Sequence, residues 1–434
     1  MLSIFGKRRF LDCDGVTRRQ FMHVGGLGFG ALSLSQLLAA RTAAAEEGVS
    51  VPDTSVVWLW LAGGPTHVET FDPKMTAPSA YHSTTGECKT PIKGVTVGGT
   101  LPQIAAVADK MALVRSFHHK NSGHGGGTHW LMTGYDNRTA DNGGVPNRPS
   151  MGSILSRIRG SNHPTTGMPT YIGMNRINAD GPAFLGAPYA PFSPSGSAKN
   201  NMTLGVDMDR LADRKRMLHA FDHLKREADA TGQLDGVDGF QQQAFEVLTG
   251  AASKAFNIKE EDPKVIARYG PRLGEQMLLA RRLCEAGAGF VTISYGGWDM
   301  HGNIANAMKS RSPQIDQAVS AFIEDCYNRS LSKNILLVIT GEFGRTPKVN
   351  KNGGRDHWAP LSTLALSGGG LKMGQVVGES AAKVDVPADR PVNPQDLMAT
   401  VFHVMGIPQT QQFKDNFGRP VYMIDKGKPI QELL

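Results

Sequence analysis

The chain contains few cysteines, 4 in 434 residues. Cys13 lies in an N-terminal segment that we expect to be removed, and the others, Cys88, Cys284 and Cys326, show no CxxC spacing. An odd number of widely spaced thiols argues against a disulfide framework. The absence of a cysteine cluster argues against a haem or iron–sulfur protein. The sequence also lacks a GxGxxG motif after an apolar run, which leaves little support for a nucleotide-dependent redox enzyme.

Long runs of one charge or of apolar residues are also scarce. Residues 1–45 carry six basic and two acidic residues, so the formal net charge of +7 falls to +3 without them. No long polybasic run remains, and nucleic-acid binding therefore has no support. The uncharged run over residues 24–40 is short and rich in glycine, so we expect no stable membrane span in the mature chain.

The N-terminus has the features of an export signal. Arg18-Arg19 is followed by Gln20, Phe21 and Met22, which resembles the twin-arginine signal, and the small residues at 43–45 offer a cleavage site. We therefore expect a signal peptide over residues 1–45, a mature domain over residues 46–434, and a location in the periplasm or outside the cell. An uncleaved N-terminal anchor is the alternative interpretation.

Short apolar runs alternate with helical patterns along the rest of the chain. Runs rich in β-branched residues at 55–61, 289–295 and 335–339 are typical of buried strands, and residues 111–116 are also expected to form a strand. The apolar spacing over 150–160 predicts an amphipathic helix that ends at a glycine, and the stretch from Gln314 to Ser330 predicts another helix. This alternation favours an α/β fold with a mostly parallel sheet and helices on both faces. Dense charge combined with helical spacing predicts a helical insertion at about residues 205–270.

Residue types that bind metals follow four of the expected strands. In an open α/β sheet, ligands bind beyond the carboxyl ends of the strands, and carboxylates with imidazoles suit a metal that prefers oxygen and nitrogen. Asp299 and His301 are two positions apart, so they would point to the same side of an extended segment. The four stretches contain His67, Glu69 and Asp72; His124 and His129; Asp299 and His301; and Glu342, Arg345, Asp356 and His357.

These stretches also have plainer interpretations. Glu342 could pair with Arg345, and His357 could be an ordinary loop histidine. The four histidines within residues 118–129 could lie solvated in a flexible loop. The coincidence of glycines and imidazoles directly after strand ends favours a site, because glycine allows the backbone to approach a ligand closely.

Five motifs carry a resemblance to a known family: GGPTHVETFDPK, HGGGTHWLMTGY, GGWDMHGN, ITGEFGRTP and GGRDHWAP. They resemble an uncharacterised family of twin-arginine-exported proteins, the domain-of-unknown-function 1501 family, within the alkaline phosphatase-like and sulfatase-like superfamily. The resemblance runs from about Thr17 to the C-terminus. It implies an alkaline phosphatase-like three-layer sandwich and a two-metal hydrolase of phosphate or sulfate monoesters, with Zn, Ca or Mg as the divalent ions.

The resemblance also implies roles for single residues. Glu342 stands where the superfamily has an Asp after its long central strand, and Asp299 with His301 resembles an Asp/His metal pair at closer spacing. His124 falls at the position of the Ser, Thr or Cys nucleophile. The expected metal ligands are therefore Asp299, His301, Glu342, His357 and His124; the expected catalytic residues are His124 and Arg345; and further candidates are His67, Glu69, Asp72, His129 and Asp356.

Two departures from the superfamily leave two functions open. The nucleophile position holds an imidazole, and the first strand ends in Ala62-Gly63-Gly64 where those enzymes have a metal-bridging Asp. One hypothesis is an exported hydrolase in which a metal-activated water attacks a sulfate or phosphate ester, a sulfated polymer included, while Arg345 neutralises substrate charge. The other is a non-catalytic, degenerate sulfatase-like protein that binds a polymer or a partner, with a co-encoded exported protein as the expected partner.

Overall fold

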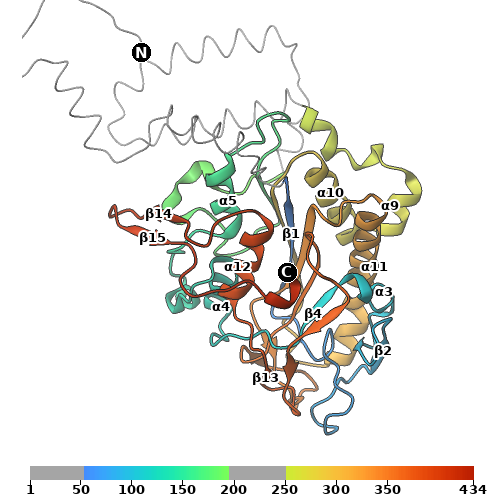
Figure 1. Ribbon diagram of the computed structural model, residues 1–434. Coiled ribbons are helices and arrows are strands. Elements are labelled where there is room, and N and C mark those ends of the chain that lie inside the picture. The colour runs from blue at the N-terminus through green and yellow to red at the C-terminus, as the bar shows by residue number, and fades with distance from the viewer. Residues whose placement is uncertain (1–52, 195–250) are drawn as a thin grey trace, which may run out of the picture. The chain divides into compact units, whose positions relative to one another are not determined.

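Figure 1 shows the computed structural model of the protein, which describes residues 53–194 and 251–434. The predicted signal peptide and residues 205–250 of the predicted insertion lie outside the described residues. A seven-stranded sheet forms the centre. Its strands, in spatial order, are β11 (Gln375–Val377), β4 (Ala112–Val114), β10 (Leu364–Gly368), β7 (Ile335–Thr340), β1 (Ser55–Ala62), β6 (Phe290–Gly296) and β5 (Tyr171–Met174).

The sheet is mostly parallel, as the sequence predicted. β1 pairs in parallel with β6 and β7, β5 pairs in parallel with β6, and β11 pairs in parallel with β4. β10 is antiparallel to both β4 and β7, so it is the strand of this sheet that runs in the opposite direction. The carboxyl ends of β1, β4, β6 and β7 therefore lie at one edge of the sheet.

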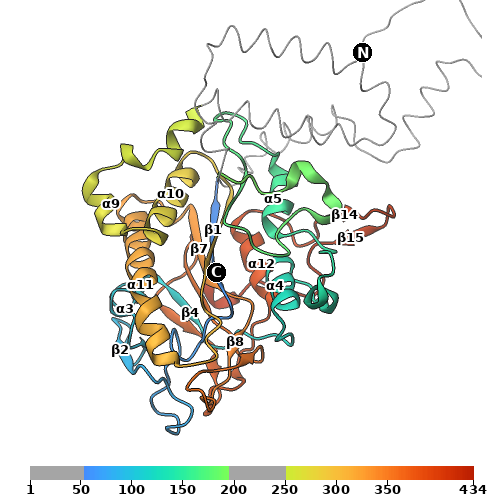
Figure 2. The ribbon, with the colours of Figure 1, turned by 180° about the vertical axis from the view of Figure 1, so that it is seen from behind.

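Helices cover both faces of the sheet (Figures 1 and 2). One face carries α3 (Pro102–Ala106), α9 (Pro263–Tyr269), α10 (Leu273–Glu285) and α11 (Ile304–Asn328), and the other carries α4 (His124–Thr133), α5 (Met151–Arg159) and α12 (Pro394–Val404). The described chain also contains short 3₁₀ helices: η1 (Ala108–Lys110), η2 (Arg138–Asn142), η3 (Ala183–Leu185), η4 (Ala187–Tyr189), η5 (Ala251–Phe256), η6 (Ile258–Glu260) and η7 (Gln431–Leu433). No helix within the described ranges combines the length and the apolar character needed to cross a membrane.

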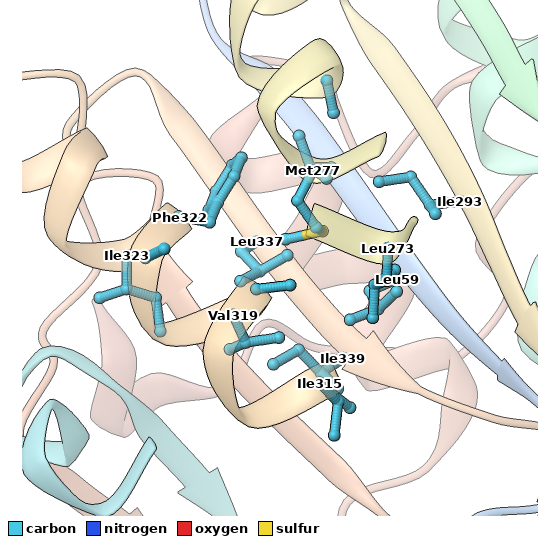
Figure 3. Packing of buried hydrophobic residues seen from close by; sticks show 14 of the residues in the cluster. Leu59, Leu273, Met277, Ile293, Ile315, Val319, Phe322, Ile323, Leu337 and Ile339 are labelled. Carbon is cyan, nitrogen blue, oxygen red and sulfur yellow. The ribbon is translucent and has the colours of Figure 1, made fainter. Parts of the chain in front are cut away.

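The continuous apolar run of β1 is explained by burial on both faces. Successive side chains of a strand point to opposite faces, so alternate residues enter two separate clusters: Val57, Leu59 and Leu61 in one, and Val56, Trp58 and Trp60 in the other. Figure 3 shows the first cluster, where Leu59, Ile293 and Leu337 of the sheet pack against Met277 of α10 and Val319 of α11. A strand buried in this way shows no polar alternation in its sequence.

Four two-stranded ribbons accompany the sheet in the described part of the chain: β2 (Glu87–Lys89) with β3 (Thr96–Gly98), β8 (Gly344–Arg345) with β9 (His357–Trp358), β12 (Glu379–Ser380) with β13 (Pro387–Asp389), and β14 (Gln412–Lys414) with β15 (Pro420–Tyr422). In the β8–β9 ribbon, Arg345 pairs with His357. The ribbon therefore folds the GGRDHWAP segment back onto the end of β7.

Two helices differ from the sequence interpretation. α11 begins at Ile304, ten residues before the predicted start at Gln314, and it carries Pro313 inside it. A proline removes a helical hydrogen bond and usually marks a boundary, so the sequence pattern indicated a later start. The glycine-rich stretch from His124 is a helix rather than a loop, and it ends at Gly134 in the left-handed conformation.

Candidate metal centre

The predicted ligands of four strand ends meet at one edge of the sheet. His124 is the first residue of α4, and Glu342 follows the end of β7. Asp299 and His301 follow β6, and His357 lies on β9. Ligand atoms of His124, Asp299 and His357 all lie within 4.8 Å of one another, and His301 Nε2 lies 3.1 Å from His357 Nε2.

The hydrogen bonds of His357 and His301 fix the direction of their lone pairs. His357 Nδ1 lies 3.0 Å from the carbonyl oxygen of Ser122, which can only accept, so Nδ1 carries the proton. His301 Nδ1 lies 2.8 Å from Asp356 Oδ1, which fixes the same tautomer. Burial lowers the pKa of His357, which favours its neutral form. Two unprotonated Nε2 atoms therefore face each other, an arrangement that a cation between them would stabilise.

Asp299 lies at the centre of this cluster. Its Oδ1 is 2.9 Å from His301 Nε2, 3.1 Å from His357 Nε2 and 2.5 Å from an Arg345 nitrogen. Partial burial alone would raise the pKa of Asp299, but the hydrogen bond from Arg345 and the positive charge of its guanidinium outweigh it and lower the pKa to about 2. The carboxylate is thus ionised at neutral pH, as a metal ligand must be.

Glu342 and His124 form a second pair beside Asp299. Glu342 Oε1 accepts from the Gly63 backbone N–H at 2.8 Å and lies 2.8 Å from His124 Nδ1. Its Oε2 is buried and has no hydrogen-bond partner among the described residues. The hydrogen bond to Glu342 raises the pKa of His124, and His124 Nε2 lies 3.5 Å from Asp299 Oδ2.

The residues present fit a divalent cation. Tetrahedral coordination at zinc–nitrogen distances of about 2.0–2.1 Å places neighbouring ligand atoms about 3.3 Å apart. The contacts among Asp299, His301 and His357 span 2.9–3.1 Å, and the His124–Asp299 contact is 3.5 Å. The cluster also contains three features that a bound cation would stabilise: facing lone pairs, an ionised carboxylate and the unpartnered Glu342 Oε2.

Arg345 does not contact solvent, contrary to its expected role on the substrate. Its side chain is 0% exposed. It donates to the carbonyl oxygens of Gly63, Gly64 and Arg355 as well as to Asp299. A guanidinium held in this way orients Asp299 and the end of β1, so Arg345 is a positioning residue. Asp356 likewise acts through His301, to which it is hydrogen-bonded, rather than lying among the facing ligand atoms.

The structure does not bring the other candidates to the centre, and each has a structural partner elsewhere instead. His67 Nε2 contacts the Val384 carbonyl oxygen at 3.0 Å, and His129 Nδ1 contacts the Tyr135 carbonyl oxygen at 2.8 Å. Asp72 accepts from Ser380 and lies 3.4 Å from Arg115. Glu69 and Arg355 form an ion pair at 2.8 Å in which both side chains are 0% exposed. These contacts are made across the fold, so sequence spacing gave no signal for them.

Sequence reasoning missed three contributors to the site. The Ser122 carbonyl orients His357. The centre of the Phe343 ring lies 4.3 Å from the centre of the His357 ring. Gly63 has φ of 115°, and a Cβ there would lie 2.4 Å from the Asp299 backbone nitrogen. The glycines that replace the expected Asp at the end of β1 thus let the Asp299 backbone approach closely, and the GGP motif was the available signal.

The fold and the site together define an α/β sandwich protein with a candidate metal centre at the carboxyl edge of its sheet. The chain belongs to the family described as "Protein of unknown function (DUF1501)", whose match covers residues 53–434. This confirms the family predicted from the motifs. No curated protein matches the chain.

Three solved structures illustrate what the chain is similar to. The PsFucS1 sulfatase from Pseudoalteromonas sp. is 13% identical, with 85% of this chain and 70% of that chain covered and a TM-score of 0.40. The phosphonate monoester hydrolase SpPMH from Silicibacter pomeroyi is 11% identical, with 87% and 76% covered and a TM-score of 0.40. The alkaline phosphatase from the Antarctic bacterium TAB5 is 11% identical, with 83% and 99% covered and a TM-score of 0.37.

Proposed function

We propose that the protein is a metal-dependent hydrolase of sulfate or phosphate esters. The observation that supports this most directly is the convergence of His124, Asp299 and His357 ligand atoms within 4.8 Å, next to the unpartnered Glu342 Oε2. Asp299, His301 and His357 would hold one divalent ion, of which Zn, Ca and Mg are the candidates. A bound ion of this kind supplies Lewis-acid polarisation of the ester oxygens and lowers the pKa of a coordinated water.

The residues of the chain supply orientation and a proton site. Arg345 fixes Asp299, and the Ser122 carbonyl fixes His357. Glu342 holds the Nδ1 proton of His124, which leaves Nε2 directed toward Asp299. His124 is 46% exposed at its side chain, so Nε2 is placed either to join the ligands or to hold a proton for the departing ester oxygen.

The hydroxyl groups nearest to His124 in sequence are engaged elsewhere. Thr128 Oγ1 donates to the His124 carbonyl oxygen at 2.6 Å, and Ser122 Oγ accepts from the Ala359 backbone N–H at 3.0 Å. Neither hydroxyl takes the place of the missing nucleophile. This arrangement favours direct attack by water over a covalent enzyme intermediate.

The proposal includes export by the twin-arginine pathway to the periplasm or the cell exterior, which is supported by the Arg18-Arg19 motif. An anionic ester, a sulfated polymer among them, would then be met outside the cytoplasm. Replacement of both arginines by lysine should abolish export. The appearance of the variant in the periplasmic fraction at wild-type level would contradict the export proposal.

A panel of 4-nitrophenyl sulfate, phosphate and phenylphosphonate tests the activity with protein reconstituted separately with Zn²⁺, Mg²⁺ and Ca²⁺. We expect turnover of at least one ester with at least one ion, and its loss in His357→Ala. The surface variant Asp389→Ala serves as the control, because Asp389 is half-exposed and pairs with Arg390. Absence of turnover under every combination would contradict a hydrolase.

The second candidate is a binding protein without catalysis, and the imidazole at the nucleophile position is the observation that favours it. A co-encoded exported protein or a polymer is the proposed partner. Co-purification of that partner, together with an inactive ester panel, is the result that favours this candidate. Turnover that depends on His357 would exclude it.

A further inference from the structure

A pocket outside the candidate metal centre lies at the same edge of the sheet. It has a volume of about 380 Å³ and is formed at the carboxyl ends of β5 and β6, the start of α10 and the first half of α11. Gly296, the last residue of β6, lines it. Three peptide units separate Gly296 from Asp299, so their Cα atoms are at most about 11 Å apart. The pocket therefore lies within reach of a ligand bound at the candidate metal centre.

The lining of this pocket is cationic and rich in hydrogen-bond donors. Two of its nine residues are Arg272 and Arg311, three are the amides Asn175, Gln276 and Gln314, and none is Asp or Glu. Neither arginine forms an ion pair with a carboxylate in the described part of the chain. Arg272 is exposed and Arg311 is partly buried, so both remain accessible to a ligand. An unpaired pair of guanidinium groups in a pocket is the arrangement that binds anions.

Contacts with neighbouring residues hold the Arg311 side of the pocket in place. The Arg311 guanidinium lies 5.5 Å from the centre of the Tyr295 ring, and a Cβ at Gly297 would meet its terminal nitrogen at 2.1 Å. Tyr295 Oη donates to Gln314 Oε1 at 3.1 Å. The Nε2 hydrogens of Gln314 are thus the donors that remain for a ligand. Gly297 is two residues from Asp299, so the pocket wall and the metal-centre loop share one backbone segment.

The other arginine is held in an unusual backbone conformation. Arg272 has φ of 57° and ψ of −100° at the start of α10, where its side chain makes no capping hydrogen bond. Non-glycine residues in sparsely populated backbone regions are often found at ligand clamps, where the surrounding structure maintains the strain. Here the strained residue is also one of the two cations of the pocket.

We propose that this pocket is an anion subsite, in which Arg272 and Arg311 bind a second sulfate, phosphate or carboxylate group of the same substrate. The substrate class is then a polyanionic ester, such as a multiply sulfated saccharide or a polyphosphorylated compound. Because the subsite is assigned to the substrate of the hydrolase described above, it rests on that proposed function. The ester to be cleaved lies at the metal centre, and the arginines select substrates that carry a further anion beside it.

Calorimetric titration of the metal-loaded full chain tests the subsite. The probes are a trisulfated heparin disaccharide and inorganic tripolyphosphate, at fixed ionic strength. Replacement of both arginines (Arg272→Gln with Arg311→Gln) should weaken binding of at least one probe about tenfold or more, the loss expected for one charge-assisted hydrogen bond. The matched control is Arg419→Gln, since Arg419 is 71% exposed and lies in the turn between β14 and β15.

The same double replacement in a His357→Ala background separates this proposal from the proposed function. Persistence of the arginine effect there supports the subsite whether or not esters are hydrolysed. The proposal is overturned if neither probe binds the wild type, or if the double variant behaves like Arg419→Gln. The hydrolase proposal fails separately, when binding depends on the arginines but no ester is turned over.

Discussion

Single hydrogen bonds decide which nitrogen of each histidine faces the candidate metal centre. Asp356 holds the Nδ1 proton of His301 at 2.8 Å, and such outer partners typically contribute 10–100-fold to metal affinity. We therefore expect Asp356→Ala to weaken metal binding by about that factor, measured by competition with a fluorescent chelator. The exposed Asp389→Ala variant is the control. Equal affinities in the two variants would show that Asp356 does not orient His301.

The buried ion pair between Glu69 and Arg355 gives a prediction for stability. Removing one partner leaves an uncompensated buried charge, which costs about 3–5 kcal/mol. Arg355→Met should therefore lower the free energy of unfolding by that amount in urea denaturation. A double variant that adds Glu69→Leu should recover much of the loss, because no isolated charge remains. A single variant as stable as the wild type would contradict the contact.

The sequence alone distinguished only some of the candidate metal ligands from residues that form structural contacts. Asp299 and His301 follow a strand end at a spacing that places both on one side, and this geometry could be predicted. Glu69 also follows a strand end, but it meets Arg355, which is 286 residues further along the chain. A carboxylate that binds metal and one that pairs with a distant arginine look the same in sequence, because the difference lies in the tertiary contact.

At the scale of elements, the glycines of α4 explain how a helix can begin inside the site. A Cβ at Gly127 would lie 2.7 Å from the carbonyl oxygen of Glu342, so glycine lets α4 pack directly on the segment that carries the ligand. Gly127→Ala would favour an isolated helix by about 0.5–1 kcal/mol. We expect it instead to destabilise the protein and weaken metal binding, because the backbone of α4 or of Glu342 must shift to make room for the added Cβ.

The matched control for this substitution is Gly181→Ala, since no atom lies within 4 Å of a Cβ built there. Thermal unfolding and metal affinity of both variants provide the comparison. Stabilisation by Gly127→Ala, with unchanged metal affinity, would show that α4 does not need the close approach.

A charge network joins α10 and α11 to the segment that follows η6. Burial alone would raise the pKa of Glu261, but hydrogen bonds from Arg281 and Arg282 and the charge of Arg329 outweigh it and lower the pKa from 4.5 to about 2. Because the folded-state pKa is depressed, the carboxylate stabilises the fold above pH 4.5, and this contribution is lost as the pH falls toward 2.

Glu261→Gln should therefore destabilise the protein at pH 7, and the difference from the wild type should shrink between pH 4.5 and pH 2. Urea unfolding at a series of pH values measures it. The neighbouring Glu260→Gln is the control, since Glu260 is 50% exposed and its arginine partner lies 3.8 Å away. A difference that is constant with pH would contradict the role of the ionised carboxylate.

Strands were easier to predict than helix boundaries. β1, β6 and β7 are buried on both faces, so their apolar runs mark them clearly. α4 contains three successive glycines and α11 contains an internal proline, and both features are typical of helix ends. Tertiary packing overrides these local preferences, which is why no helix was predicted at the first and a later start was predicted at the second.

At the scale of the whole molecule, one sheet brings together residues that lie more than 200 positions apart, as the His124–Glu342 contact does at 2.8 Å. Parallel strands place their carboxyl ends at a common edge. The convergence of the candidate ligands could therefore be predicted from the alternation of strands and helices in the sequence. The expected three-layer arrangement is confirmed. The anion pocket could not be predicted, because Arg272 and Arg311 come to line one pocket only through the packing of α10 against α11.

The metal content of the purified protein tests the central claim most directly. We expect the wild type, dialysed against trace metals and analysed by inductively coupled plasma mass spectrometry, to retain at least about one equivalent of a divalent ion per chain. The Asp299→Asn, His357→Ala double variant should retain less than about a tenth of that amount, with circular dichroism confirming that it is folded. Equal metal content in both proteins, or none in the wild type after loading with Zn²⁺, Mg²⁺ and Ca²⁺, would contradict the account.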